Sequence, residues 1–249
     1  IDIIKNIILK YFDKKSNTYN ISIQFKMSMK SLINKPKELL ELIAECLKCK
    51  DLEVKKNGEV FTSMVLVNNM LDKLPESVWE DEKLKWFDPA AGMGNFPIAV
   101  YLKLMKTLKS KIKDKHSRKK HILENMLYMS EKSKKNVYIM KQIFDINNEF
   151  KLNIYNGDTL ETDFEKIFNI KEFDIIIGNP PYNKDNTGTG NSYWQFFVTK
   201  SINQLKKDGY LVFVHPSTWR KPQSEKSKMK GYFELMTRIN SLLYLEIHN

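Results

Sequence analysis

The stretch FDIIIGNPPY, residues Phe173–Tyr182, carries the strongest structural signal in this chain. Its first part is mostly apolar and β-prone, which is typical of a strand buried on both faces of a parallel sheet. Pro180 and Pro181 cannot continue that strand, because proline lacks the backbone N–H that a sheet ladder needs. The side chains after Gly178 must therefore leave the sheet at its carboxyl edge, where ligands of open α/β sheets bind.

Residues Asn179, Pro180 and Tyr182 together suit a planar ligand that carries an amino group. The Asn179 amide oxygen and the Pro180 carbonyl are hydrogen-bond acceptors, and the Tyr182 ring is a flat stacking surface. Adenine is such a ligand. The alternative is an ordinary proline turn after a strand, which the Asn and Tyr at these offsets disfavour.

The composition indicates a folded chain with a polyanionic partner. Its 249 residues are 42% hydrophobic and 12% aromatic, enough for one sizeable α/β domain and an appendage. The 41 Lys and Arg residues exceed the 30 Asp and Glu residues, and the charge of +11 favours nucleic acid as the partner. Lysine predominates, and it contacts phosphate without the bidentate geometry that reads guanine. Contacts to a nucleic-acid backbone are expected, although AT-rich coding also enriches lysine.

The sequence predicts neither a metal site nor a membrane segment. The C-x-x-C spacing of Cys46 and Cys49 begins inside a run whose apolar residues have helical spacing, and no second cysteine pair completes a zinc site. No run is long and apolar enough to span a bilayer and no signal peptide is visible, so a cytoplasmic location is expected. The first residue is Ile1 rather than methionine, which suggests a fragment of a longer protein.

The spacing of apolar residues predicts an α/β fold with a doubly wound, mostly parallel, Rossmann-like sheet, because short apolar runs alternate with longer amphipathic ones from Leu84 onward. A small helical segment is expected over residues 1–56, including a helix at Lys37–Lys48. Another helix, Val65–Leu74, is expected to be capped by Thr62. Strands are expected at residues 84–88, 126–130, 151–155, 173–178, 209–215 and 242–247. Helices are expected at residues 94–109, 132–145, 161–169, 192–207 and 225–239.

The first expected strand runs into the turn Asp88–Phe96, which reads DPAAGMGNF. Glycines between a strand and a helix let a ligand approach the backbone closely, so this turn predicts a nucleotide-type pocket. It is neither the G-x-G-x-x-G dinucleotide fingerprint nor a P-loop, so NAD and ATP are poorly supported. Asp88 is instead suited to accept hydrogen bonds from a cationic amino group.

Two further carboxylates follow the next two expected strands. Glu131 is placed where it can accept both hydroxyls of a ribose, and Asp158 where it can receive an adenine amino group. Taken alone, each of these two carboxylates could equally well be a helix cap or a turn residue instead of a ligand contact. Three carboxylates at the ends of three successive strands, with Asp88 as the first, nevertheless describe one pocket.

The turn Asp88–Phe96 and the later Asn179–Tyr182 resemble the S-adenosylmethionine-dependent DNA adenine-N6 methyltransferases. The segment Gly58–Leu71 is similar to the cofactor motif that precedes the glycine turn in the gamma-type members and in related fused type II restriction-modification enzymes. Ser63 stands where that family usually has proline. The resemblance covers about residues 57–247.

The resemblance implies a methyltransferase catalytic domain over residues 57–249 that binds S-adenosylmethionine and DNA. Asp88, Glu131 and Asp158 would bind the methionine amino group, the ribose and the adenine of the cofactor. Further cofactor contacts are implied for Phe61, Thr62, Pro89, Ala90, Gly92, Gly94, Phe96 and Asn179. Catalysis is implied for Asn179, Pro180, Pro181 and Tyr182.

In such a site Asn179 and Pro180 would hydrogen-bond the target amino group, and Tyr182 would stack on an extruded adenine. The amino nitrogen is a poor nucleophile because its lone pair is delocalised, and two acceptors favour a pyramidal nitrogen that attacks a sulfonium methyl in line. No metal is required. Extruding the base costs roughly a few kcal/mol, and stacking on Tyr182 returns on the order of 1 to 3 kcal/mol.

Three polar or basic groups of residues each have two possible interpretations. The loop Asp185–Ser192 either closes over substrate or is an ordinary surface loop. The basic stretch Lys109–His121 is either a solvated loop or helix end, or a phosphate-facing patch. A third group either meets DNA phosphates or forms a solvated helix face, and it comprises Arg220, Lys221, Lys226, Lys228 and Lys230.

The chain lacks the target-recognition domain that the resemblance would place after Ile247, so a specificity domain or subunit outside this chain is expected. Asp51–Lys55 only faintly resembles a D-x-E-x-K nuclease site. Alternative functions are an RNA adenine or protein glutamine methyltransferase, since the Asn179–Tyr182 motif suits any planar group with an amino substituent. A non-catalytic DNA-binding subunit is a third alternative, against which the intact Asp88, Asp158 and Asn179 argue.

Overall fold

The computed structural model describes residues 62–145, 147–183, 193–221, 223–225, 227 and 229–247, together with Lys35 and Glu38. Most of the expected N-terminal helical segment therefore lies outside the described residues, although Glu38 is helical. Other predicted features outside them are Cys46, Cys49, Asp51–Lys55, Phe61, Asp185–Ser192, Lys226 and Lys228.

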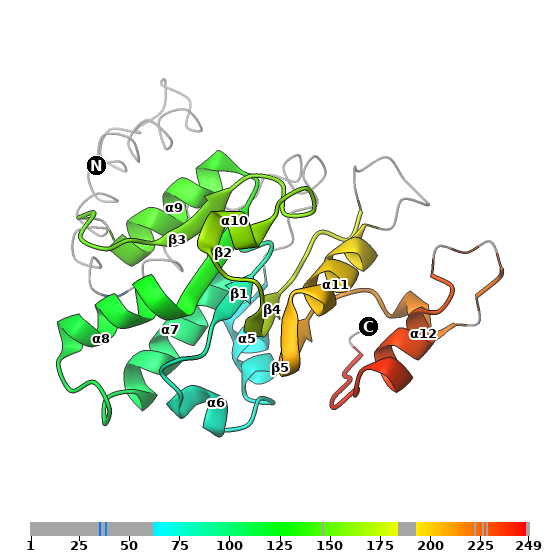
Figure 1. The fold of residues 1–249 in the computed structure, drawn as a ribbon, viewed down its shortest axis with the longest axis horizontal. Helices are drawn as coiled ribbons and strands as arrows, with labels where there is room; N and C mark the ends of the chain where they lie inside the picture. Colours follow the sequence, from blue (N-terminus) through cyan, green and yellow to red (C-terminus); the bar gives the residue numbers. More distant parts are fainter. Residues whose placement is uncertain are drawn as a thin grey trace, which may run out of the picture.

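Within the described residues, five strands form one sheet flanked by helices (Figure 1). The strands are β1 Trp86–Asp88, β2 Leu127–Glu131, β3 Asn153–Asn156, β4 Phe173–Gly178 and β5 Leu205–Phe213. The helices are α5 Met64–Leu71, α6 Ser77–Glu80, α7 Asn95–Thr107, α8 Lys115–His121, α9 Lys134–Asp145, α10 Phe164–Phe168, α11 Trp194–Asn203 and α12 Tyr232–Glu234. The described residues also contain a short 3₁₀ turn at Ser217–Arg220 and two π-helical segments, at Ile122–Met126 and Leu235–Ile239.

The strand order is β3-β2-β1-β4-β5, and every neighbouring pair is parallel. The chain moves outward from β1 to β3 and then returns to the other side of β1, where Phe87 lies opposite Ile176 of β4. The order therefore reverses between β1 and β4. Such a switch point is where open α/β sheets bind ligands, outside the carboxyl ends of the strands. The predicted doubly wound α/β fold is confirmed.

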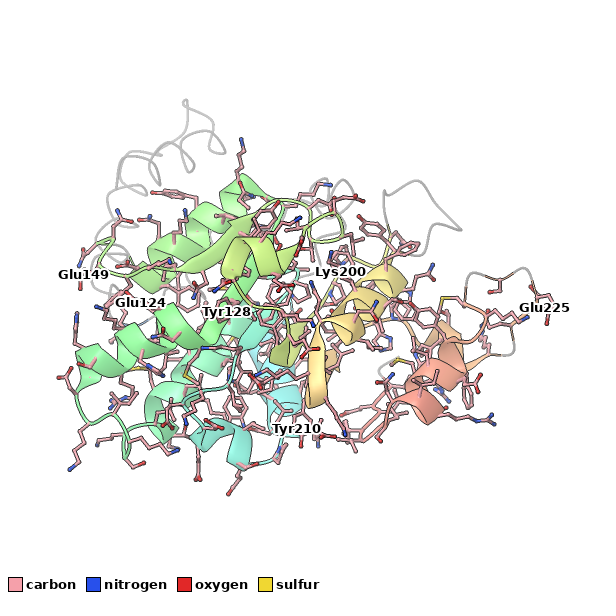
Figure 2. All side chains as sticks on the ribbon, viewed as in Figure 1. Glu124, Tyr128, Glu149, Lys200, Tyr210 and Glu225 are labelled. Atoms are coloured by element: carbon pink, nitrogen blue, oxygen red, sulfur yellow. The ribbon has the colours of Figure 1, made fainter. Side chains whose placement is uncertain are left out.

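The side chains of the central strands alternate between two apolar layers, because successive strand residues point to opposite faces. Trp86 and Ile175 pack with α5, α7 and α9 on one face, whereas Phe87 packs toward α10 on the other. Phe87 is fully buried, its ring centroid lying 4.4 Å from that of Phe173 and 4.8 Å from that of Phe164. Side chains fill the space between the sheet and its helices (Figure 2).

Helix α11 is held from two directions. Trp194 packs with Trp219 in a third apolar cluster, against residues of β5. Lys200 points the other way and its Nζ donates to the carbonyls of Leu160 and Thr162, at 3.0 and 2.7 Å (Figure 2). These contacts tie α11 to the segment that follows β3.

The expected strand 242–247 is wrong. These residues are described without regular hydrogen-bonded structure, and Leu243 is 75% exposed. Its apolar pattern is compatible with a strand, but a strand forms only when a neighbour pairs with its backbone groups. The expected helix 225–239 is also too long, since helical structure begins only at Tyr232, after Gly231 with a left-handed φ of 82°.

The start of α5 differs from the prediction by one residue. Ser63, rather than Thr62, caps the helix, because the Ser63 Oγ accepts a hydrogen bond from the Leu66 N–H at 3.3 Å. The Thr62 hydroxyl is thereby left for another partner. Helix α5 also ends at Leu71, three residues before the predicted end.

The basic stretch Lys109–His121 lies at the opposite end of the sheet from Asn179. Helix α8 continues through the π-helix directly into the amino end of β2. One cation of the stretch is internal, since Arg118 is 5% exposed and donates to the carbonyls of Ile112 and Lys113. The stretch thus does not contribute to the edge where the strands end.

The buried ring of Phe87 should contribute strongly to stability. Replacing it with Ala removes its contacts on the α10 side, and we expect the free energy of unfolding to fall by about 3–5 kcal/mol. Urea denaturation measures this loss. Val65→Ala, at a side chain that is 71% exposed, is the control and should change stability by less than about 0.5 kcal/mol. Equal losses in the two variants would contradict the assignment of Phe87 to the core.

Candidate active site

The turn after β1 bends sharply around two glycines. Gly92 and Gly94 have left-handed φ values of 55° and 100°, which non-glycine residues rarely adopt. The Gly94 N–H donates to the Ala91 carbonyl at 2.8 Å, and α7 begins at Asn95. A side chain at Gly94 would meet Met140 of α9 at 3.1 Å. The predicted strand–turn–helix unit is therefore present, with its backbone open to close approach.

Asp88, the last residue of β1, is an almost fully buried acid at 2% exposure. Its Oδ1 accepts a hydrogen bond from the Ala90 N–H at 3.0 Å. Burial raises its pKa to about 8; the hydrogen bond from Ala90 opposes this rise and the nearby negative charge of Glu131 adds to it. A nearby cation would favour the ionised form. Asp88 is thus an acceptor suited to a positively charged group.

Gly178 at the end of β4 makes room for Asp88. A Cβ atom at this position would lie only 2.8 Å from the Asp88 Oδ1 atom, so a larger residue would displace the carboxyl group. Because β1 and β4 are neighbours, Asp88 and the residues after Gly178 occupy the same strand edge.

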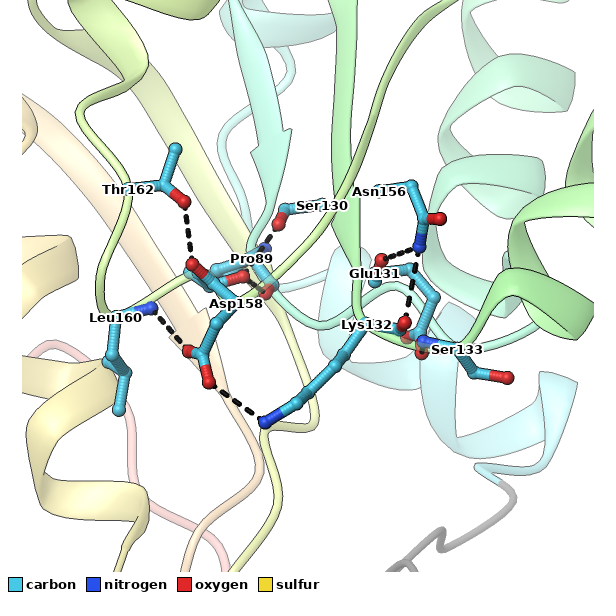
Figure 3. A network of polar contacts seen from close by, with 10 residues as sticks. Pro89, Ser130, Glu131, Lys132, Ser133, Asn156, Asp158, Leu160 and Thr162 are labelled. Carbon is cyan, nitrogen blue, oxygen red and sulfur yellow. Dashed lines mark hydrogen bonds and ion pairs between the residues drawn. The ribbon is translucent and has the colours of Figure 1, made fainter.

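Glu131 and Asp158 both accept hydrogen bonds from the backbone around them. The two Glu131 oxygens accept from the N–H groups of Gly92 and Ser133, at 2.8 and 2.7 Å. The Asp158 Oδ1 accepts from the Leu160 N–H at 3.0 Å, and its Oδ2 lies 2.9 Å from the Lys132 ammonium (Figure 3). Glu131 therefore connects the end of β2 to the glycine turn.

A buried pair of hydroxyls holds the ends of β1, β2 and β3 together. Ser130 and Thr159 share a hydrogen bond of 2.6 Å, and the Thr159 hydroxyl also donates to the Pro89 carbonyl. The Ala91 N–H donates to the Ser130 carbonyl at 3.0 Å. These residues join the three carboxylate-bearing segments into one polar network (Figure 3). Neither hydroxyl is among the residues predicted from the sequence, where the only local signal is a hydroxyl residue beside each carboxylate.

Asn179 leaves β4 with its amide oriented by Thr62. The Asn179 Nδ2 atom donates to the Thr62 hydroxyl at 3.0 Å, although the two residues are 117 positions apart. The Oδ1 atom of Asn179 is buried and has no hydrogen-bond partner in the described residues. Buried polar atoms without partners are rare in folded proteins, so this acceptor is available for a ligand donor.

Pro180 is buried and Tyr182 is half-buried. Burial raises the pKa of the Tyr182 hydroxyl, and a side-chain hydrogen bond with Asn179 opposes that rise. The Tyr182 carbonyl accepts from the Tyr193 N–H at 2.8 Å, and its side chain packs beside the cluster of Trp194 and Trp219. The ring is thus held near the Asn179 amide.

The structure does not bring every predicted site residue to this edge. Phe96 is 3% exposed and belongs to the hydrophobic core on the α7 face of the sheet. Arg220 ends the 3₁₀ turn that follows β5, and both Arg220 and the next residue, Lys221, are exposed. Lys230 is also exposed, and it forms an ion pair with Glu225. The roles of these residues stay predictions.

The described residues contain no group of three or more His, Cys, Asp or Glu side chains arranged to hold a metal ion. Over the same residues, no helix is both long and apolar enough to cross a membrane. The groups that this strand edge offers are carboxylates, amides and backbone N–H groups.

Solved structures with this arrangement of strands define the class of fold. A protein from Listeria monocytogenes, described as a candidate class I S-adenosylmethionine-dependent methyltransferase, superposes with a TM-score of 0.54 at 17% identity, over 83% of this chain and 61% of its own. The modification subunit of a candidate type I restriction enzyme from Vibrio vulnificus YJ016 has a TM-score of 0.59 at 14% identity, over 84% of this chain and 43% of its own. The chain has the Rossmann-like fold of these methyltransferases.

The sequence comparison identifies the family. Residues 10–247 match the model of the Eco57I restriction-modification methylases, and the chain belongs to this family. An uncharacterized adenine-specific methylase from Mycoplasma pneumoniae is 28% identical over 238 residues. That alignment covers 66% of this chain and 56% of the relative, so the chain spans little more than half of the relative's length. The resemblance inferred from the glycine turn and the Asn179–Tyr182 motif is confirmed.

The raised pKa of Asp88 should make stability depend on pH. Between the unfolded value of 3.8 and the folded value of about 8, the folded chain keeps a proton that the unfolded chain loses. Stability should therefore fall as pH rises through this window, by up to about 1.4 kcal/mol for each pH unit. The Asp88→Asn variant has no ionisable group at this position. The melting temperature of the variant minus that of wild type should therefore increase from pH 5 to pH 9.

Thermal denaturation in a series of buffers measures this trend. Asp81→Asn, which changes a partly exposed acid beside α6 and leaves Asp88 in place, is the matched control and should follow the wild-type pH profile. A constant difference between Asp88→Asn and wild type at every pH would contradict the raised pKa.

Proposed function

We propose that this chain is the catalytic part of a DNA adenine-N6 methyltransferase of a restriction-modification system, with S-adenosylmethionine as the methyl donor. The observation that carries the proposal is the buried Asn179 Oδ1, which has no hydrogen-bond partner among the described residues, at the same strand edge as the buried acid Asp88. Membership of the Eco57I methylase family and the adenine-specific name of the Mycoplasma pneumoniae relative support it further. Residues 57–249 would form the catalytic domain, following a helical segment at 1–56.

The residues around the glycine turn fit the cofactor. Among the described residues, the Asp88 carboxyl group has only the Ala90 N–H as a hydrogen-bond partner, and a cation beside it would lower its raised pKa. Asp88 would therefore accept the methionine ammonium and lose its proton on binding. Backbone N–H groups hold both Glu131 oxygens at the end of β2, and this carboxylate would receive the ribose hydroxyls. When bound, the cofactor supplies an electrophilic methyl group on a sulfonium.

Asp158 would receive the adenine amino group of the cofactor. Its present partner Lys132 has a side chain that is 77% exposed, and ion pairs of this kind contribute about 0–1 kcal/mol. Losing this ion pair would therefore cost little. The contacts implied for Phe61, Thr62 and Phe96 also remain part of the proposal.

Asn179 and Pro180 would orient the target. Their oxygen atoms accept the two hydrogens of the adenine amino group, which keeps its lone pair directed at the methyl carbon. Methyl transfer there would form a carbon–nitrogen bond and break the methyl carbon–sulfur bond, with the electron pair kept by sulfur and the surplus amino proton passed to water. Tyr182 would stack on the extruded base and offset part of the cost of removing it from the duplex.

The DNA backbone would approach from the side where Arg220 and Lys221 are exposed. The excess of cations in the chain favours such an approach, and lysine contacts are made mainly to phosphate. Sequence specificity would come from a domain or subunit outside this chain. The expected site of this reaction is the cytoplasm.

The substrate is identified by methyl transfer. The full-length protein, incubated with methyl-labelled S-adenosylmethionine, should label the adenine amino group of duplex DNA rather than RNA or a release factor. Label recovered only in RNA or protein would support the corresponding alternative and overturn the DNA assignment. Lack of cofactor binding in calorimetry would favour a non-catalytic DNA-binding subunit.

Asn179→Ala should lower the turnover number by about 10²–10³-fold, because one of the two acceptors that hold the amino group is lost. The dissociation constant for the cofactor should stay within about twofold, as measured by calorimetry. Asn125→Ala changes an exposed side chain just before the start of β2, at the other end of the sheet, and should behave like wild type. Normal turnover in Asn179→Ala would refute its role.

Tyr182 should act through its ring. Tyr182→Phe keeps the stacking surface and should retain most of kcat/KM on duplex DNA, whereas Tyr182→Ala should lose about 5- to 150-fold, the equivalent of 1 to 3 kcal/mol. Steady-state kinetics with one duplex substrate compares the three proteins. Equal losses in the Phe and Ala variants would assign the effect to the hydroxyl and its contact with Asn179.

A further inference from the structure

The first turn of α7 contains a buried asparagine, Asn95, that is outside the set of residues assigned to the cofactor and the target. Asn95 is 7% exposed, and its Nδ2 atom donates to the Thr62 carbonyl at 2.6 Å. Thr62 is itself 7% exposed and precedes α5 by two residues. The bond therefore anchors the entry to α5 onto the start of α7, directly beside the glycine turn.

The same threonine holds Asn179. Its carbonyl accepts from Asn95, and its hydroxyl accepts from the Asn179 Nδ2 atom at 3.0 Å. Three segments that are far apart in sequence thus meet in one chain of two hydrogen bonds. Each donor in this chain is a side-chain amide, and each acceptor belongs to Thr62.

This chain of bonds has a consequence for the Asn179 amide. The N–H end of the amide faces Thr62, and the buried Oδ1 end, which has no partner among the described residues, is left to accept a hydrogen bond from a ligand. The reverse orientation would place the amide N–H₂ group, with two donors, in the position of the unpartnered oxygen. Losing the Thr62 acceptor would remove a hydrogen bond from this part-buried N–H group, which is unfavourable. Holding Thr62 in place therefore holds the acceptor in place.

We propose that Asn95 is a positioning residue that acts through Thr62 to keep the Asn179 Oδ1 atom directed at the target amino group. This inference rests on the proposed methyl transfer. It also revises the expected role of Thr62, which becomes a support for Asn179 in addition to a neighbour of the cofactor. Because Asn95 starts the helix after the glycine turn, the cofactor site and the target site share this support.

Kinetic variants test the proposal. Thr62→Val removes the hydroxyl at nearly constant shape, and Asn95→Ala removes the donor to the Thr62 carbonyl. Both should lower the turnover number by roughly 5- to 100-fold, while the calorimetric dissociation constant of S-adenosylmethionine stays within about twofold. Thr62→Ser keeps a hydroxyl and should restore most of the turnover lost in Thr62→Val.

A double-mutant cycle tests whether the two residues act in series. If Asn95 acts through Thr62, the variant carrying both Asn95→Ala and Thr62→Val should be little slower than Thr62→Val alone. Additive losses of turnover would show that Asn95 does not act through Thr62. Thr107→Val provides a matched control at the other end of α7, where that hydroxyl donates to the Trp79 carbonyl, and it should leave turnover unchanged.

A measurement without turnover separates this inference from the proposed function. The Asn179 side-chain amide, identified by its absence from the Asn179→Ala NMR spectrum, should exchange slowly with solvent in wild type and in Thr62→Ser. Its exchange should accelerate in Thr62→Val and Asn95→Ala. If wild type methylates no DNA, the proposed function fails even when this exchange pattern holds. If wild type is active and both variants keep full turnover or a protected amide, the positioning role fails.

Discussion

The parallel pairing of β1 with β4 brings an acid and a glycine into contact at the carboxyl edge of the sheet. Strand β1 is only three residues long, but it lies in the middle of the sheet and ends in Asp88. Its neighbour β4 ends in Gly178, whose missing side chain leaves the space that the Asp88 carboxyl group occupies. Asn179 can then follow immediately beside that acid. Without this close approach, the two halves of the site would be separated by a side chain.

The site combines well-satisfied groups with groups that are left for a ligand. Glu131 and the buried hydroxyls of Ser130 and Thr159 have hydrogen-bond partners, and these bonds tie the strand ends together. Asp88 and the Asn179 Oδ1 atom are buried with few partners or none in the described residues. A buried acid with a raised pKa destabilises the fold, so its presence at a strand edge points to function rather than stability.

Positive charge is divided between the two ends of the sheet. At the amino end, Arg118 is buried and bonds carbonyl groups of its own segment, which gives it a structural role. At the carboxyl end, Arg220 and Lys221 are exposed after β5. Exposed cations near the strand ends are the ones suited to meet phosphates, because they are still hydrated and unobstructed. The net charge alone could not distinguish these two kinds of residue.

The sequence by itself determined the layers of the fold and the places where its strands end. The apolar run before Gly178, the two prolines after it and the glycine turn after Asp88 are local patterns, and their backbone consequences follow from the residues themselves. Only the tertiary structure decided that Thr62 contacts Asn179, since that bond depends on how α5, α7 and β4 pack, and residues 117 positions apart leave no local signal. It also decided that residues 242–247 form no strand in the described structure, because an apolar run becomes a strand only beside a partner that accepts its hydrogen bonds.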